Sequence, residues 1–487
     1  MAGGLMQLVA QGTQDKYLTG NPQITYFKVV YRRYTNFSME LIEQQFNGSV
    51  GFGKNVSCTL SRNGDLIHSM FVKVKLPQVS TNVAGGGMFR WIRNVGQALL
   101  KCVEIQIGAV RIDKHYSDWL HIWNELTMED RLRPSYQDMV GDIPSLYRMA
   151  YTDAPETMLC NPNGCVGDIP YDPEHQASRC TPAKDLTIPL QFWFNRNPGL
   201  ALPLVSMPYA EVKLVIEFES LNHLCYVRGN VDVPDLVDGS LLTNYIYLDN
   251  DEKTQFTKKE HEYLIEQLQY SGDESILTDQ ASLRLHFNHP CKELIWVTQK
   301  KAFTGAGECH VYGGPQPFNY TRDWNMDYVE MEDSNGDGTG REIGASLTGE
   351  DDPMYVVSQP GQRVMRVDPL GPGASILAPR EPIRQAVLVL NGQDRMAKRA
   401  GRYFSTVQPY QHHTGHVGGG KGIYVYSFGL EPEVYQPSGT CNLSRVDNAQ
   451  LNVSFFDDNT PMRMKIFATN YNVLKINNGM GGLVYSN

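Results

Sequence analysis

Short runs in which apolar and polar side chains alternate recur along the whole chain, and they restrict it to an architecture of antiparallel β-sheets. Each run is bounded by turn residues, as half-buried strands are. The runs are residues 69–77, 102–112, 185–195, 211–218, 245–249, 294–298, 385–392, 422–430, 450–456 and 464–473. Helical periodicity is sparse. It is clearest at 115–126, where Trp119, Ile122, Trp123 and Leu126 share one face, and weaker at 259–270.

The order of these features repeats in the two halves of the chain. Residues 107–120 and 390–404 both run from a strand through a tight turn and an Arg to a short polar-aromatic helix. An aromatic-rich strand follows in each half, and then a Pro-containing bend and an alternating strand at 199–218 and 436–455. The repeat predicts one β-sandwich that has been duplicated. A length of 487 residues also exceeds the roughly 250–300 at which a single core stops growing.

The charge of the chain argues against a nucleic-acid-binding surface. It has 43 basic and 53 acidic residues, a net charge of -10. Ten of the acids, with Arg341 as the one base, lie between positions 323 and 352, so the rest of the chain is nearly neutral. Proteins that neutralise phosphates usually show a basic excess. The N-terminus lacks the pattern of a signal peptide, no segment has the roughly 20 apolar residues of a membrane span, and nine scattered cysteines suit a reducing compartment.

Residues 20–37 combine five aromatic side chains with three cations. The apolar residues recur at helical spacing, which predicts a short helix with one apolar face, formed by Ile24, Phe27, Val30, Tyr31 and Tyr34. A strand fits less well, because neither alternate set of residues is consistently apolar. A groove for single-stranded nucleic acid is the alternative interpretation, but three cations would neutralise only about three phosphates.

Three groups of residues resemble metal sites, and each lacks ligands. Residues 333–344 begin like a calcium loop, but Gly344 stands where a bidentate Glu is needed. The histidines of 412–416 lack a fourth zinc ligand nearby, and Cys160, Cys165 and Cys180 are too widely spaced for structural zinc, which favours loose thiols. The sequence therefore predicts no metal, no cofactor and no catalytic residues.

Several blocks of the sequence resemble the major capsid protein of nucleocytoplasmic large DNA viruses, most nearly the chlorovirus or phycodnavirus type. They include SRNGDLI, PGLALPL and LNGQDR, and they run in the family's order from the first residue to the last. Only the two long loops, 128–184 and 304–380, lack recognisable counterparts. The blocks are residues 1–37, 61–67, 111–119, 198–204, 261–269, 390–395, 436–449 and 470–487.

The resemblance implies an all-β double jelly roll, two eight-stranded antiparallel β-sandwiches in tandem with short helices and long loops. Its expected divisions are an N-terminal assembly arm at 1–26, a first jelly roll at 27–249, a linker at 250–261 and a second jelly roll at 262–487. The implied function is structural and not enzymatic. Three copies would form a pseudo-hexagonal capsomer, and capsomers would tile the icosahedral shell of a large double-stranded DNA virus.

The resemblance also implies partners and a location. The partners are the chain itself as a homotrimer, neighbouring capsomers, minor capsid proteins and an internal membrane beneath the shell, with no direct contact to nucleic acid. The location is the virion, after synthesis and assembly in the host cytoplasm. The long loops are expected on the outer face, where length and acidity suit exposure to solvent.

For the segment after the turn at Asn21–Pro22, the resemblance predicts an assembly role. The apolar residues, Ile24, Phe27, Tyr31 and Tyr34, would pack beneath the first jelly roll. Lys28, Arg32 and Arg33 would face acidic minor capsid proteins or the anionic membrane. The alternative function is a jelly-roll carbohydrate-binding surface protein, which would need exposed aromatic platforms drawn from Trp193, Trp296 and Trp324.

Overall fold

The computed structural model describes residues 3–81, 87–147, 150–151, 180–304, 314–322, 331–332, 341–342, 381–415, 421–456 and 461–485. Most of both long loops falls outside these ranges, including the candidate calcium ligands at 333–340, together with Cys160, Cys165, His416 and Trp324. Within the described part of the chain, no helix is long and apolar enough to cross a membrane.

The first sandwich is built from a five-stranded and a four-stranded antiparallel sheet. One has the order β1 Phe37–Gln45, β14 Asp238–Leu248, β3 Leu66–Leu76 and β10 Lys184–Pro189, with β11 Leu202–Pro203 also on β3. The other has the order β2 Asn55–Thr59, β12 Val212–Phe218, β6 Leu100–Ile107 and β7 Val110–Tyr116. Shorter strands lie at the margins: β4 Val79–Ser80, β5 Gly87–Trp91, β8 Ala150–Tyr151, β9 Cys180–Thr181 and β13 Cys225–Gly229.

The second sandwich repeats this plan. One sheet has the order β15 His261–Ile276, β26 Met462–Asn477, β17 Pro290–Lys300 and β23 Ile423–Ser427, with β24 Cys441–Asn442 on β17 and β27 Met480–Leu483 on β26. The other has the order β16 Gln280–Arg284, β25 Ala449–Phe455, β20 Ile383–Leu390 and β21 Gln393–Asp394, with β22 Arg399–Ala400 on β20. The strands β18 Met331–Glu332 and β19 Arg341–Glu342 form a separate pair.

Each main strand of the first half therefore has a counterpart in the second, in the same sheet position. β1, β3 and β14 correspond to β15, β17 and β26, and β6 and β12 correspond to β20 and β25. The two-residue strands also correspond. β11 pairs with β3, β24 pairs with β17, and each leads into a 3-10 turn, at Leu204–Ser206 and Leu443–Arg445. The duplication inferred from the sequence is thus visible strand by strand.

Alternation along the strands creates the two cores. In β12 the side chains of Val212, Leu214, Ile216 and Phe218 are buried and the residues between them are partly exposed. The matching residues of β25, Ala449, Leu451, Val453 and Phe455, are buried in the second core. Because successive side chains of a strand point to opposite faces, this pattern closes each pair of sheets over an apolar interior.

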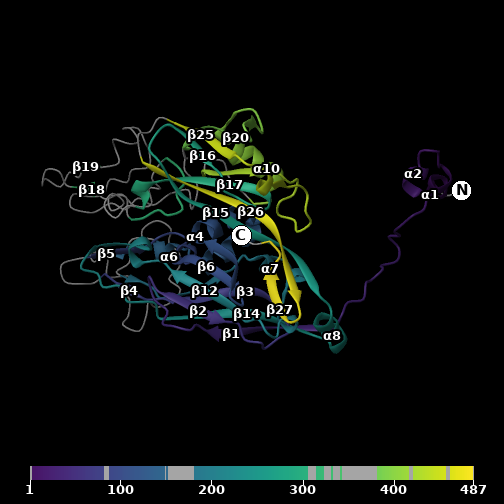
Figure 1. Ribbon diagram of the computed structural model, residues 1–487, viewed down its shortest axis with the longest axis horizontal. Coiled ribbons are helices and arrows are strands. Elements are labelled where there is room, and N and C mark those ends of the chain that lie inside the picture. The colour runs from purple at the N-terminus through teal and green to yellow at the C-terminus, as the bar shows by residue number, and fades with distance from the viewer. Residues whose placement is uncertain are drawn as a thin grey trace.

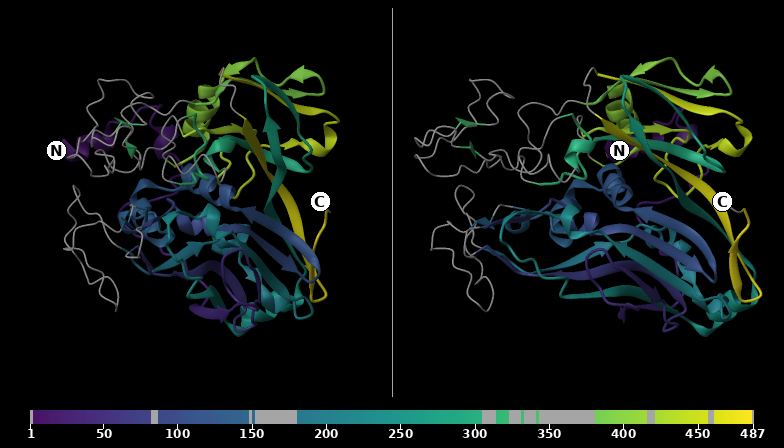
Figure 2. Two further views of the ribbon diagram at one scale, coloured as in Figure 1. Left: turned by 90° about the vertical axis from the view of Figure 1, so that its left-hand side faces the viewer. Right: turned by 60° about the vertical axis from the view of Figure 1, so that its left-hand side comes forward.

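Helices are short and lie at the ends and between the sandwiches. In the first half they are α3 Val95–Leu99, α4 Ser117–Thr127, α5 Arg133–Val140, α6 Pro144–Tyr147 and α7 Trp193–Arg196. The helix α8 Asn250–Lys258 links the two halves, and a π-helix at Tyr403–Val407 continues into α10 Gln408–His412 in the second half. Figure 2 shows the first sandwich (purple to teal) lying below the second (teal-green to yellow).

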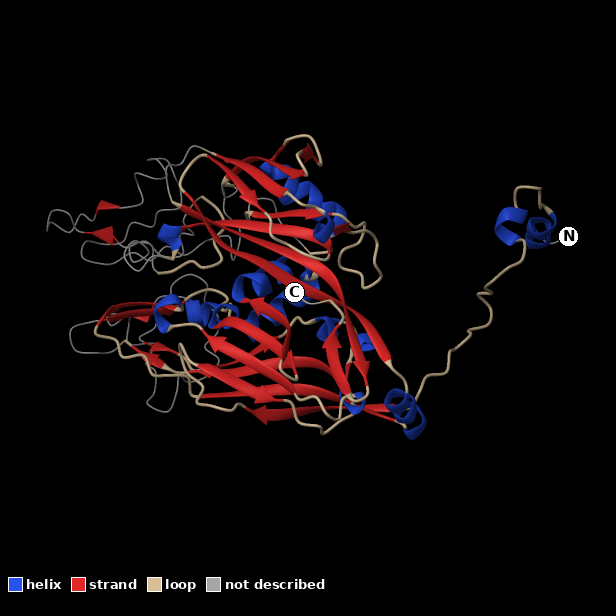
Figure 3. Cartoon of the chain, viewed as in Figure 1, coloured by secondary structure: helices blue, strands red, loops and turns tan. Residues whose placement is uncertain are grey.

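The two ends of this body carry different features. α8 lies at one end, and β4, β5, β18 and β19 lie at the other (Figure 1). The N-terminal segment leaves the body beside α8, because Phe37 at the start of β1 pairs with Leu248 at the end of β14. It then extends away from the body to two short helices, α1 Gly3–Val9 and α2 Lys16–Thr19 (Figure 3).

Four local predictions differ from the structure. The run 102–112 is a hairpin, which turns at Gly108 with φ +62°, a conformation that glycine adopts without strain. The run 185–195 stops being a strand at Pro189, and its aromatic end forms α7. The predicted helix at 259–270 is strand β15, and the predicted helix over 24–34 is absent. That last segment has no described surface to bury its apolar face, and short isolated helices are marginal in water.

Candidate assembly surfaces

The two sandwiches meet through α4, which lies on the outer face of the second half's first sheet. The apolar stripe of the helix predicted from the sequence is buried there, and it forms one cluster with side chains from three strands of that sheet. The helix supplies Trp119, Ile122, Trp123 and Leu126; the sheet supplies Ile295 and Val297 of β17, Ile423 and Val425 of β23, and Phe467 of β26. We call this contact the intrachain joint.

Ion pairs surround the apolar centre of the intrachain joint. Asp118, at the start of α4, lies 2.5 Å from the ammonium of Lys465 on β26, and it accepts a hydrogen bond of 2.9 Å from the hydroxyl of Tyr320. Glu125, on the same helix, pairs with Lys421. Burial alone would raise the pKa of Glu125, but the Lys421 ammonium and His121 hold it at about 2. The helix is therefore fixed by charges as well as by packing.

A second set of charges joins β15 to the first sandwich. One carboxylate oxygen of Glu266 lies 2.9 Å from the guanidinium of Arg196 on α7, and the other lies 2.6 Å from the ammonium of Lys292 on β17. The backbone N–H of Leu268 donates a 3.1 Å hydrogen bond to Asp113 of β7. β15 is the edge strand of its sheet, so these contacts from the first sandwich cover groups that an edge would otherwise expose.

The histidine-rich segment lies at this joint and binds carboxylates. His413 is buried between Glu433, 2.9 Å from Nδ1, and Glu293, 3.2 Å from Nε2. His412 contacts the backbone carbonyl of Leu430 at 2.9 Å. Burial alone would lower the pKa of His413, but the two carboxylates raise it to about 9. Both ring nitrogens of the imidazolium carry a proton, which leaves no lone pair for a metal, and the described residues hold no metal-ligating cluster.

The segment after His413 attaches to the end of α4. The backbone N–H of Gly415 donates to the carbonyl of Leu126 at 2.7 Å, and the hydroxyl of Thr414 donates to the carbonyl of Thr127 at 3.3 Å. These carbonyls belong to the last turn of the helix, which has no intrahelical partners for them. The segment from the second half therefore caps the helix of the first half.

The N-terminal segment exposes its apolar side chains. Phe27 is 99% exposed and Tyr34 is 85% exposed, and the other predicted arm residues, Ile24, Lys28, Tyr31, Arg32 and Arg33, are exposed as well. The predicted packing of Ile24, Phe27, Tyr31 and Tyr34 beneath the first jelly roll is therefore absent in the single chain. An apolar surface of this extent is typical of a segment that binds a partner.

The sequence analysis missed a further exposed apolar surface, on strand β1. Phe37, Met39 and Leu41 point to one side of this strand and are each about half exposed. β1 is the edge of its sheet, paired on one side with β14. The alternation of FSMELIEQQ was a usable signal for this strand, because Phe37, Met39 and Leu41 then fall on one face of it.

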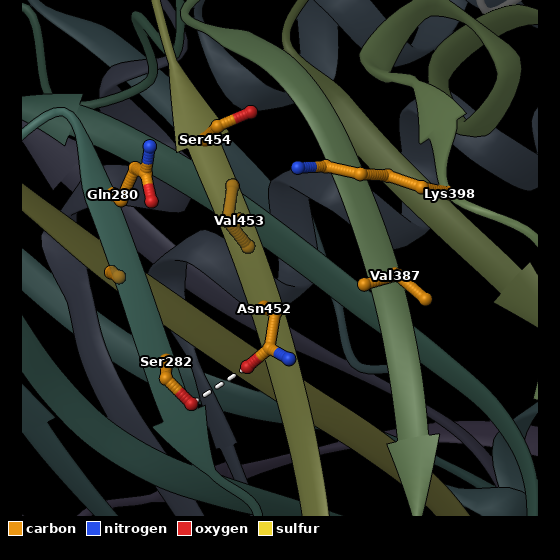
Figure 4. Close-up of a pocket in the computed structure, with 8 residues that line it drawn as sticks. Gln280, Ser282, Val387, Lys398, Asn452, Val453 and Ser454 are labelled. Atoms are coloured by element: carbon orange, nitrogen blue, oxygen red, sulfur yellow. Dashed lines mark hydrogen bonds between the residues drawn. The ribbon is translucent and has the colours of Figure 1, made fainter. Parts of the chain in front are cut away.

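A shallow hollow of about 500 Å³ lies over β16, β25 and β20, and its lining is mostly polar (Figure 4). Ser282 donates a 2.6 Å hydrogen bond to Asn452, and Lys398 reaches over the same strands. No aromatic side chain lines it. Trp193 and Trp296 are both at most 2% exposed, so neither is an aromatic platform of the kind that a carbohydrate-binding surface requires.

The interpretation of the three loop cysteines as loose thiols is wrong for Cys180. This residue, at the start of β9, is buried and disulfide-bonded. Among the described cysteines, Cys58, Cys102, Cys225, Cys291 and Cys441 are free thiols.

Comparison with known proteins identifies the family. Residues 25–249 match the family model of the major capsid protein N-terminus, and residues 252–482 match that of the large eukaryotic DNA virus major capsid protein. The chain is 42% identical over 533 residues to the major capsid protein of Phaeocystis pouchetii virus, and 37% identical over 518 residues to that of Paramecium bursaria Chlorella virus 1. Both alignments cover 100% of each chain.

Solved structures agree with the sequence relatives. A quasi-atomic model of the PBCV-1 virus capsid matches with a TM-score of 0.66 and 33% identity, covering 95% of this chain and 100% of the other. The Faustovirus major capsid protein, 13% identical, matches with a TM-score of 0.67 over 96% and 94% of the two chains, which shows a shared fold. The fold is therefore a double jelly roll, and the chain belongs to the family of major capsid proteins of large eukaryotic DNA viruses.

Proposed function

We propose that three copies of this capsid protein associate into a pseudo-hexagonal capsomer, and that these capsomers tile the icosahedral shell of a large double-stranded DNA virus. The observation that carries the proposal is the exposed edge strand β1, with Phe37, Met39 and Leu41 uncovered. Its counterpart in the repeat, β15, is covered by the first sandwich. A closed ring of copies would cover β1 as well, using one interface three times.

We further propose that the chain divides as the sequence suggests, into an arm at 1–26, jelly rolls at 27–249 and 262–487, and a linker at 250–261. The positions of the strands support this division. The first sandwich's strands run from Phe37 to Leu248, α8 follows at Asn250–Lys258, and β15 starts at His261. Residues 27–36 precede the first strand and extend from the body, so they continue the arm in space.

The N-terminal segment is proposed to bind the capsid's inner partners during assembly in the host cytoplasm. Its exposed apolar side chains would cover apolar surface on minor capsid proteins or on neighbouring capsomers. Lys28, Arg32 and Arg33 would meet acidic groups of those proteins, and an anionic membrane beneath the shell is the competing partner. The net charge of -10 argues against direct contact with nucleic acid.

Light scattering of the purified chain, together with negative-stain microscopy, tests the central proposal. The expected result is a mass three times that of one chain, in particles of hexagonal outline. A monomer in dilute buffer would contradict it.

A further inference from the structure

Two free thiols face each other across neighbouring strands of the second sandwich. Cys291 of β17 is the direct partner of Cys441 of β24 in an antiparallel pair, and both are free thiols. Side chains at directly opposite positions of such a pair point to the same face of the sheet. That face is the inner one here, because Cys291 is part of the second core and Cys441 packs against it.

The spacing of paired strands suits a bond between these two sulfur atoms. Directly opposite residues of antiparallel strands have Cα atoms about 4.5–5.5 Å apart, and disulfides join residues whose Cα atoms are about 4.4–6.8 Å apart. The Cβ atoms of opposite residues are about 4.5–5.5 Å apart, against about 3.5–4.5 Å in a disulfide. Closing the bond therefore requires a shift of about 1 Å.

The strand β24 is able to make this shift. It has only two residues, and its pairing among the described strands is with β17. β17 itself is held along most of its length by β26. The thiol of Cys291 donates a 3.1 Å hydrogen bond to the backbone carbonyl of Glu293. A thiol is a weak donor, so the loss of this bond is a small cost.

Hydrogen bonds next to Cys441 keep the two segments aligned. The backbone N–H of Leu443 donates to the carbonyl of His289 at 3.1 Å, and the backbone N–H of His289 donates to the hydroxyl of Ser444 at 2.7 Å. The side chain of Asn442 accepts a 3.1 Å hydrogen bond from the backbone N–H of Ser444, which fixes the turn. The two thiols are therefore held opposite each other before any bond forms.

The two thiols differ in exposure, which gives them different roles. Cys441 is partly exposed, whereas Cys291 is completely buried. Burial raises the pKa of both thiols, and the positive charge of Arg395 opposes this rise at Cys441. A small oxidant should therefore react first at Cys441, the residue with more solvent access and more thiolate character. Cys291 needs no solvent access, because its partner lies beside it.

A disulfide elsewhere in the chain shows that the folded protein holds oxidised cysteine. Cys180, in the first sandwich, is disulfide-bonded. Disulfides persist in oxidising surroundings and are rare in the cytosol. A chain that is assembled in the host cytoplasm, as proposed above, and then leaves the cell in a virion would encounter both environments.

We infer that Cys291 and Cys441 form a latent disulfide, which stays reduced during synthesis and closes when the folded protein meets a peroxide. The timing rests on the proposed assembly in the cytoplasm, whereas the bond itself does not. In the first step the sulfur of Cys441 attacks one oxygen of hydrogen peroxide and the O–O bond breaks. A sulfenic acid forms, and the second oxygen leaves as water with the proton that the thiol gave up.

In the second step the sulfur of Cys291 attacks the sulfur of Cys441. The S–S bond forms, the S–O bond breaks, and the hydroxyl group leaves as water with the proton of Cys291. Two thiols have then lost two electrons to the peroxide, which is reduced to two molecules of water.

The new bond would cross-link most of the second sandwich. Cys291 and Cys441 lie 150 positions apart, and the chain between them includes β20 and β23, which belong to different sheets. A cross-link stabilises a fold mainly because it restricts the unfolded chain, and the effect grows with the length of the closed loop. Oxidation should therefore stabilise the second sandwich after the protein has folded.

Oxidation of the purified full-length chain tests the inference. The reduced protein is treated with hydrogen peroxide, digested without reductant and analysed by mass spectrometry. We expect a cross-linked species that joins the peptide of Cys291 to the peptide of Cys441 and that disappears after reduction. Cys441→Ser should abolish this species. Cys102→Ser is the matched control and should retain it, because Cys102 lies in the first sandwich, where its thiol contacts Glu217 at 3.4 Å.

Thermal unfolding gives a second measurement. Peroxide should raise the melting temperature of the unaltered protein more than that of Cys441→Ser, and a reductant should remove this difference. Both proteins contain the Cys180 disulfide, so its contribution cancels in the comparison.

Three results would overturn the inference. They are oxygen added to Cys441 without the cross-linked species, a disulfide from Cys441 to another copy of the chain, and an equal shift of melting temperature in the two proteins. None of these results depends on the number of chains in the assembly, so the proposed trimer is tested separately by its mass.

Discussion

His413 and Glu293 face each other at the intrachain joint, with 3.2 Å between Nε2 and Oε2 and both side chains fully buried. Glu293 also accepts a 2.9 Å hydrogen bond from Thr469, and Glu433 holds the other side of the His413 ring. Burial alone would raise the pKa of Glu293, but the His413 imidazolium holds it below its usual value. The cluster connects β17 and β26 to the segment that caps α4, so its protonation affects the intrachain joint.

The first prediction is that stability falls as the pH rises from about 6.5 to about 9. The pKa of His413 is about 9 in the folded chain and about 6.5 when unfolded. The charged ring therefore stabilises the fold fully below about pH 6.5, by roughly 3 kcal/mol, and this contribution is lost as the ring deprotonates. Urea unfolding at fixed protein concentration measures it.

His413→Gln should flatten this pH dependence and lower stability at pH 6.5. His412→Gln is the matched control, since that ring contacts a backbone carbonyl. An unchanged slope in His413→Gln would assign the pH dependence to other groups.

The second prediction compares a buried helix residue, Leu126 of α4, with an exposed one, Tyr410 of α10. Leu126→Ala should lower the free energy of unfolding by about 2–5 kcal/mol, because it opens a cavity in the joint. Tyr410→Ala should change the stability of the isolated chain by less than about 0.5 kcal/mol, because that side chain is exposed. Denaturation at concentrations that keep the chain monomeric gives both values. Equal losses would show that the joint is not the main contact of α4.

A third prediction concerns the capping segment. A methyl group at Gly415 would collide with the carbonyl oxygen of Leu126, which is backbone and has little room to move. Gly415→Ala should therefore destabilise the joint, visible as a lower melting temperature. Gly482→Ala is the control, since nothing lies within 4 Å of the added atom. If Gly415→Ala and Gly482→Ala have the same melting temperature, the capping segment moves to accommodate the methyl group without loss of stability.

The fourth prediction separates the arm from the capsomer. Deletion of residues 1–26 combined with Arg32→Glu and Arg33→Glu should leave a soluble trimer, because these residues lie outside both sandwiches. Shell assembly should be blocked, as electron microscopy of virus-producing cells would show. Normal shells from this variant, or DNA binding that depends on the two arginines, would contradict the assigned role.

The sequence predicted well those elements whose pattern is set by a single buried face. α4 is one, since its stripe from Trp119 to Leu126 is buried on one side. β15 was mistaken for a helix because Ile265, Glu266 and Gln267 are all buried. The strand lies between its own sheet and the first sandwich, and burial on both faces removes the alternation that marks a strand.

Contacts distant in sequence explain the other differences. Residues 192–195 have strand propensity, but Trp193–Arg196 form α7. The Asn195 side chain accepts a hydrogen bond from the backbone N–H of Phe192 and donates one to the backbone carbonyl of His68. Tertiary contacts therefore override local preference at this point. The charged surroundings of His413 were also hidden, because Glu293 and Glu433 lie 120 and 20 positions away in the chain.

The short connection through α8 also sets an order of events in time. Between Leu248 and His261 the chain has little freedom, so the second sandwich meets the first at an effective concentration on the order of millimolar or more. Other copies arrive only by diffusion, and the first sandwich is synthesised first. The intrachain joint should therefore form before copies meet, and each newly made chain would enter assembly with its two sandwiches already joined.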